Sequence, residues 1–123
     1  MAFLTDRKRA RGLGSARAGT ERHWQMMVSS IGLVIVVPIF VVTFGLALGR
    51  SHADVVAYFS HPFPAIATAL ALTVGILHFM HEAHEAIEDY VHGAAGKLAR
   101  VGVSALAYVL IATALFALVR LAL

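Results

Sequence analysis

The chain has 123 residues, of which 59% are hydrophobic and 14% are charged, and its formal net charge at pH 7 is +3. A soluble domain has about 25% charged residues, so this composition excludes an ordinary soluble globular domain. The sequence contains no cysteine, which excludes disulfides, thiolate metal sites and cysteine nucleophiles within the chain.

Three apolar runs without a charged side chain organise the sequence. They cover residues 28–49, 62–77 and 101–119, which are 22, 16 and 19 residues long. A hydrocarbon core of about 30 Å is crossed by roughly 20 helical residues at about 1.5 Å each. We therefore predict an all-α membrane protein with transmembrane helices at about 21–48, 62–92 and 97–121. These helices form a single membrane-anchor domain over residues 1–123, and residues 53–59 form a short interfacial helix in the first loop.

Basic residues are unevenly distributed along the chain. Six of the ten Lys and Arg residues lie within residues 1–22, so that residues 1–20 form a basic arm. With Lys97 and Arg100, eight lie on one side of the predicted bundle, while Arg50 and Arg120 lie on the other. The positive-inside bias predicts a cytoplasmic N-terminus and a periplasmic C-terminus. The arm is interpreted as a contact with membrane lipids rather than with nucleic acid.

A polar stripe marks the end of the second apolar run. Residues 77–92 contain four of the seven histidines and four of the seven acidic residues. At about 100° per residue, Glu82, Glu85 and Asp89 lie within about 40° of His78 on the helix surface. A charged residue at the bilayer centre costs about 2.5 to 3.5 kcal/mol, so this face must contact protein, a cofactor or water. The intervening His and Glu residues are interpreted mainly as a solvated or subunit-facing helix end.

His78 is the deepest polar residue of this stripe and follows apolar residues. A buried membrane histidine is typical of a ligand or a proton relay. Neither H-E-x-x-H nor the Glu-x-x-His of di-iron bundles occurs, so a non-haem metal centre is disfavoured. A single axial histidine for haem remains open, with a second ligand from elsewhere. No nucleophile triad, phosphate loop or nucleic-acid module appears.

These features resemble a known family. Three helices, a basic arm and a histidine followed eleven and twelve positions later by Asp-Tyr resemble the hydrophobic membrane anchor of succinate dehydrogenase (respiratory complex II). The matching residues are His78 and residues 87–92 (IEDYVH). Residues 11–16 (RGLGSA), with Gly19-Thr20 and His23-Trp24, are similar to alphaproteobacterial members.

The resemblance implies a non-catalytic subunit of a quinone-reducing enzyme in the bacterial inner membrane. It implies that His78 is one axial ligand of a haem b iron, with the other ligand supplied by a partner anchor subunit of the cytochrome b556 type. Asp89 and Tyr90 would border the ubiquinone site beside an iron–sulfur subunit, with the Tyr90 hydroxyl bonded to a quinone carbonyl. Electrons would come from succinate through a flavoprotein subunit, linking the tricarboxylic acid cycle to the respiratory chain.

The sequence departs from this family at two positions. Glu82 stands where relatives often have glycine, one turn after the haem histidine. Met27 stands where many relatives have an arginine able to meet a haem propionate. His81 and His84 are alternative ligands to His78.

Two other functions are compatible with the residues. A small cation or proton transporter subunit would use His78, His81, Glu82 and Glu85 as a relay or Zn²⁺ site. A structural adaptor without a cofactor is the third alternative.

Overall fold

The chain folds into long helices, here in a computed structural model that describes residues 5–7 and 18–123. The helices are α2 (Ala18–Gly45), α3 (His52–Phe59), α4 (Pro62–Tyr90) and α5 (Gly93–Ala122). Three segments are long and apolar enough to cross a membrane, namely Gly19–Gly45, Pro62–Tyr90 and Gly93–Ala122. The predicted all-α fold with three spanning helices is therefore confirmed. Most of the basic arm, residues 1–4 and 8–17, and the motif at 11–16 lie outside the described residues.

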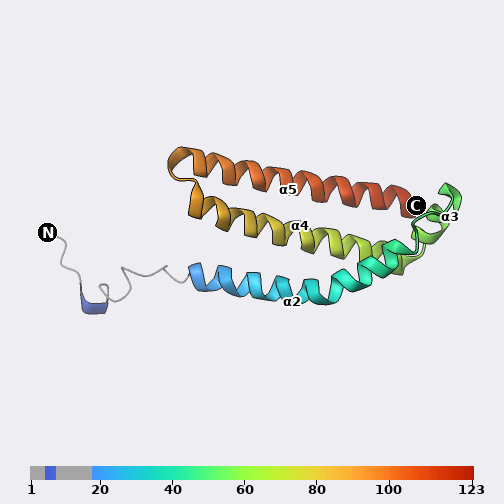
Figure 1. Cartoon of the computed structure of the whole chain (residues 1–123), viewed down its shortest axis with the longest axis horizontal. Helices are drawn as coiled ribbons and strands as arrows, with labels where there is room; N and C mark the ends of the chain where they lie inside the picture. The colour runs from blue at the N-terminus through green and yellow to red at the C-terminus, as the bar shows by residue number, and fades with distance from the viewer. Residues whose placement is uncertain (1–4, 8–17) are drawn as a thin grey trace.

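Helix α4 is the middle of the bundle. It packs against α2 on one side and α5 on the other, whereas α2 and α5 share no packed interface within the described residues (Figure 1). In the most apolar window of α4, 28% of the residues are buried, against 6% in α2 and in α5. The outer helices therefore present most of their surface to whatever surrounds the chain.

Helix α2 contains Pro38, which lacks the N–H that the helix would use at this position. Its ribbon changes direction in the second half, which contains this proline (Figure 1). The helix ends at Gly45, three residues before the predicted end, and residues 46–49 form turns. There Ala47 and Leu48 donate to carbonyls three residues back, at 3.0 and 3.2 Å, because the last turn tightens before Gly49 at φ +76°.

The first loop contains the predicted short helix. Helix α3 starts one residue earlier than expected because Ser51 caps it. The Ser51 hydroxyl accepts the Asp54 N–H at 3.2 Å and donates to the Asp54 carboxylate at 2.6 Å. Tyr58 donates its hydroxyl to the Thr43 carbonyl at 2.8 Å, which ties α3 to the end of α2.

The connection between α4 and α5 is tighter than the sequence predicted. Helix α4 ends at Tyr90 rather than 92, because Val91 is extended, and α5 begins at Gly93 rather than 97. Gly93 has φ +72°, a conformation that glycine adopts at no steric cost. A Cβ at Gly96 would overlap the Val91 carbonyl, so this turn also requires glycine there. The chain therefore reverses direction directly after Tyr90.

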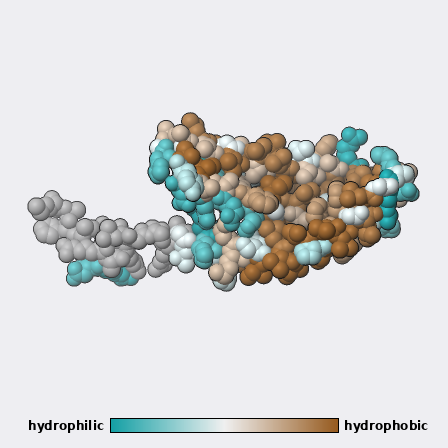
Figure 2. Space-filling model, in the orientation of Figure 1, coloured by the Kyte–Doolittle hydropathy of each residue, from teal (hydrophilic) through white to brown (hydrophobic). Residues whose placement is uncertain are grey.

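Hydrophobic and hydrophilic residues occupy different positions along the helix axes. Figure 2 shows hydrophobic residues along the helices and hydrophilic residues gathered at the two ends of the bundle. Helix α4 has 29 residues and is about 44 Å long, which exceeds a hydrocarbon core of about 30 Å. Part of α4 therefore extends beyond a core of this thickness.

Candidate functional site

His78 lies on α4, and its side chain is only 14% exposed. Its Nδ1 atom is 2.9 Å from the hydroxyl oxygen of Ser29 on α2. Its Nε2 atom is 3.6 Å from a carboxylate oxygen of Glu82, one turn further along α4. One ring nitrogen is therefore held by a neighbouring helix, and the other faces a side chain of its own helix.

The side chain that faces Nε2 can move aside. The Glu82 side chain is 53% exposed, so it can leave the imidazole by changing rotamer without unpacking the bundle. An imidazole with one nitrogen held by an outer-shell hydrogen bond and the other left for the metal is the usual arrangement of a metal-ligating histidine. The residues present therefore fit an axial ligand of a flat cofactor such as haem.

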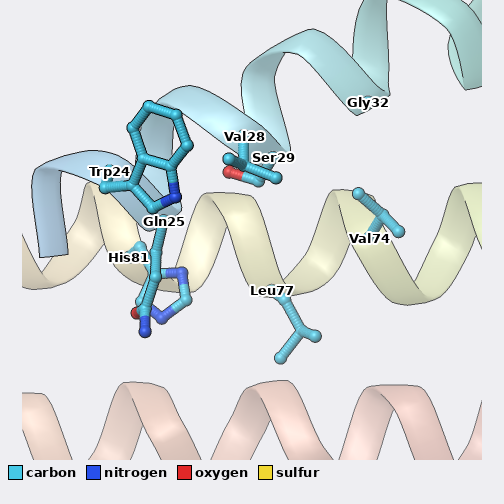
Figure 3. Close-up of a pocket in the computed structure, with 8 residues that line it drawn as sticks. All are labelled: Trp24, Gln25, Val28, Ser29, Gly32, Val74, Leu77 and His81. Atoms are coloured by element: carbon cyan, nitrogen blue, oxygen red, sulfur yellow. The ribbon is translucent and has the colours of Figure 1, made fainter. Parts of the chain in front are cut away.

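His81 lies in a different environment from His78. It lines a groove of about 540 Å³ between α2 and α4 (Figure 3). The α2 wall consists of Trp24, Gln25, Val28, Ser29 and Gly32, and Val74 and Leu77 join His81 on α4. Ser29 thus lines this groove and contacts His78. His81 itself has no hydrogen-bond partner within the described residues, whereas His78 contacts Ser29 and Glu82.

His84 connects α4 to α5. Its Nε2 atom is 3.0 Å from the Ser104 hydroxyl oxygen and 3.2 Å from the Arg100 carbonyl oxygen. His84 was expected to belong to a solvated or subunit-facing helix end; the structure adds that this half-buried side chain contacts α5 of the same chain. His84 has a local role in joining two helices.

Asp89 and Tyr90 lie at the C-terminal end of α4, where the helix ends and the chain reverses. Both are exposed, and the Tyr90 side chain is among the most exposed large ones, with a residue exposure of 85%. Their side chains have no hydrogen-bond partner within the described residues. Both side chains are therefore free to contact another chain or a ligand.

Glu88, next to this pair, is the centre of an ion cluster that links all three long helices. Its carboxylate accepts from Arg22 of α2 at 3.0 and 3.2 Å and from Arg100 of α5 at 2.7 Å. The interpretation of Glu88 as a solvated residue was incomplete, because it bridges helices while remaining partly exposed. In the sequence, Arg22 and Arg100 stood out only as members of two groups of basic residues, at positions 7–22 and 97–100, and nothing connected them to Glu88.

The sequence did not indicate a role for Ser29. Ser29 and Ser30 form a polar pair within an otherwise apolar run, but nothing in the sequence connected this pair to His78. Met27, where relatives were expected to carry arginine, is 43% exposed. The nearest cation on α2, Arg22, is already paired with Glu88.

A multidentate metal centre finds no support in the described residues. Among residues 5–7 and 18–123, no group of three or more His, Asp or Glu side chains is arranged to hold a metal ion. The polar stripe instead consists of separate contacts, with His78 bonded to α2, His84 to α5 and Glu88 to both.

These observations define an integral membrane subunit in which the central helix carries a half-buried histidine and an exposed Asp-Tyr pair. Residues 2–119 match the family model of the succinate dehydrogenase/fumarate reductase transmembrane subunit. The chain is 41% identical over 123 residues to the succinate dehydrogenase hydrophobic membrane anchor subunit of Paracoccus denitrificans, covering 100% of this chain and 95% of that protein. No solved structure gives a significant match. The chain belongs to the succinate dehydrogenase/fumarate reductase transmembrane subunit family, and within it to the membrane anchor subunits of succinate dehydrogenase.

Proposed function

We propose that this anchor subunit holds one side of a haem b through His78. The second axial ligand comes from a partner anchor subunit, as the resemblance to the family implies. Members of the family generally bind haem b, which supports the assignment. When bound, the haem supplies a one-electron redox centre within the membrane.

The observation that carries this proposal is the asymmetric environment of the His78 ring. Nδ1 is bonded to Ser29 at 2.9 Å, while Nε2 faces the exposed Glu82 side chain. Nε2 can therefore ligate a metal while Nδ1 keeps its bond to α2. Glu82 must move aside, which its exposure permits.

We further infer that Asp89 and Tyr90 border a ubiquinone-reduction site. Tyr90 lies about 18 Å along the helix axis from His78, so the two sites are distinct positions on one helix. A quinone takes up two electrons and two protons to become a quinol. The Tyr90 hydroxyl is suited to donate a hydrogen bond to a quinone carbonyl oxygen, and the adjacent Asp89 carboxylate is suited to hold a proton for delivery.

The electrons and the remaining walls of this site come from other subunits of the complex. We propose that succinate is oxidised in a flavoprotein subunit and that an iron–sulfur subunit carries the electrons to the membrane. The high exposure of Tyr90 supports a site completed by such a neighbour. A donor at the membrane interface can reach the end of α4 without entering the hydrocarbon core.

We propose that this end of the bundle lies in the cytoplasm and that the C-terminus is periplasmic, in the inner membrane of a bacterium. Arg22, Lys97 and Arg100 lie at the end of the bundle that carries the α4–α5 turn, and they line one groove. Arg50 and Arg120 belong to the opposite end. The excess of cations at the first end supports the assignment through the positive-inside bias.

The test of this function is purification of the native complex from membranes. We expect a flavoprotein, an iron–sulfur subunit and a second anchor subunit to co-purify, with a b-type band in the reduced-minus-oxidised spectrum and succinate-dependent ubiquinone reduction. A chain that purifies alone, lacks the b-type band and transports cations would instead support the transporter function.

A further inference from the structure

Ser29 makes two short contacts through one hydroxyl group. Its oxygen lies 2.9 Å from the Met26 carbonyl oxygen on the same helix and 2.9 Å from Nδ1 of His78 on α4. A carbonyl oxygen can only accept a hydrogen bond, whereas a hydroxyl has one proton to donate and two lone pairs. The Ser29 proton therefore points to Met26, and an oxygen lone pair faces the imidazole.

With Glu82 moved away from Nε2, this arrangement favours one of the two ring nitrogens of His78 as the site of the proton. A lone pair facing Nδ1 favours a proton on Nδ1, which leaves the lone pair of Nε2 free. Nε2 is the atom that faces the exposed Glu82 side chain, at 3.6 Å. The contact with Ser29 thus leaves the unprotonated nitrogen on the side of the ring from which Glu82 can move away.

Burial strengthens the hydrogen bond between Ser29 and His78. The His78 side chain is 14% exposed and Ser29 is half-buried, so water competes weakly for either group. A hydrogen bond in such a low-dielectric environment is electrostatically stronger than one in water. An acceptor on the outer nitrogen of a metal-bound histidine also increases the basicity of the ligating nitrogen.

We propose that Ser29 is a positioning residue for the haem iron ligand, which selects the His78 tautomer and sets the electron donation of the ligating nitrogen. This inference rests on the proposed role of His78. The Nδ1–H of His78 donates to Ser29, and Ser29 donates to the Met26 carbonyl. Increased donation from Nε2 stabilises ferric haem over ferrous haem, so Ser29 lowers the midpoint potential of the haem.

A purely structural role for Ser29 is the alternative, because small polar residues often allow transmembrane helices to pack closely. The adjacent Ser30 separates the two roles. Its hydroxyl also donates to the Met26 carbonyl, at 2.8 Å, but it makes no contact with His78. Ser29→Ala and Ser30→Ala therefore remove equivalent bonds to the same carbonyl, and only the first removes the bond to the imidazole.

The experiment is a redox titration of the haem in the assembled complex, purified from membranes with wild-type, Ser29→Ala, Ser30→Ala and Ser29→Thr subunits. Outer-shell substitutions at metal sites typically weaken metal affinity or activity by about 10- to 100-fold. For Ser29→Ala we expect a preference for ferric haem that is about tenfold weaker, which is a rise of about 59 mV for a one-electron couple. Ser30→Ala and Ser29→Thr are expected to keep the wild-type potential, because both retain a hydroxyl facing His78.

An unchanged potential in Ser29→Ala, or an equal rise in Ser30→Ala, would overturn the inference. If Ser29→Ala does not assemble, Ser29→Cys is titrated instead, since sulfur fills a similar space but accepts weakly. An unchanged potential in that variant would overturn the inference as well. His78→Ala is measured in parallel, and its retention of the full b-type band would mean that the proposed function of His78 has failed, not merely the role of Ser29.

Discussion

The carboxylate of Glu88 lies 2.7 Å from the guanidinium of Arg100, and this contact joins α4 to α5 directly beside the Asp89-Tyr90 pair. Arg22 of α2 binds the same carboxylate at 3.0 Å, so one side chain connects the three long helices at one end of the bundle. The C-terminal end of α4 is thereby fixed relative to both neighbours. The position of Tyr90 therefore depends on the ion pairs of Glu88, which lies two residues earlier in the chain.

Glu88→Gln tests this connection. The side chains are 38% to 48% exposed, and exposed ion pairs contribute only about 0.2 to 1 kcal/mol each, so we expect the complex to assemble with little loss of stability. Quinone reduction is expected to fall, because the end of α4 loses its fixed position, while the haem spectrum stays unchanged. The measurements are the thermal stability, the reduced-minus-oxidised spectrum and the succinate–ubiquinone rate. Glu85→Gln, an exposed carboxylate on the same helix, is the matched control, and an equal loss of rate in that variant would contradict the account.

Tyr90→Phe tests the proposed quinone contact. Loss of one hydrogen-bond donor to the quinone carbonyl is expected to cost about 1 to 3 kcal/mol, which is roughly 5- to 150-fold in rate. Haem content should not change, because Tyr90 lies about 18 Å along the axis from His78. Steady-state ubiquinone reduction and haem spectra of the purified complex provide the readout. Tyr108→Phe removes an exposed hydroxyl from α5 and should leave the rate unchanged; a wild-type rate in Tyr90→Phe would remove Tyr90 from the site.

The proposed orientation predicts which ends of the chain are periplasmic. An alkaline phosphatase domain fused after Leu123 should be active, because this enzyme matures only outside the cytoplasm. The same domain inserted in the turn between α4 and α5 should be inactive. Activity measured in intact cells, with the amount of each fusion protein determined by immunoblot, distinguishes the two cases. The reversed pattern of activities would place Asp89 and Tyr90 on the periplasmic side, away from a cytoplasmic electron donor.

The fold was largely predictable because the membrane imposes one strong rule on the sequence. Charge-free runs of the right length must be helices, since every backbone polar group needs a partner inside the helix. The polar stripe predicted that one face of α4 contacts protein, a cofactor or water, and the structure shows α4 as the central helix, packed on α2 and α5. The ends of the helices were less predictable, because they depend on local capping, such as Ser51 before α3 and the positive φ of Gly93.

The contacts of the stripe were not predictable from its spacing. A helical wheel gives the direction of His78, His84 and Glu88 around α4, but not which neighbouring helix each one meets. Ser29 and His78 are 49 positions apart, and Arg22 and Glu88 are 66 apart, so no local pattern connects them. Asp89 and Tyr90 are exposed for a different reason in this account. The proposed quinone site includes residues of another subunit, so the sequence of one chain cannot define the whole site.

The measurement that tests the central claim most directly is the reduced-minus-oxidised spectrum of the purified complex carrying His78→Ala. We expect the b-type band to be lowered or shifted, since axial ligation is lost on one face of the haem. His81→Ala, which alters a side chain in the groove between α2 and α4, should keep the band. A full b-type band in the assembled His78→Ala complex, or its loss in His81→Ala alone, would contradict the assignment of His78 as the haem ligand.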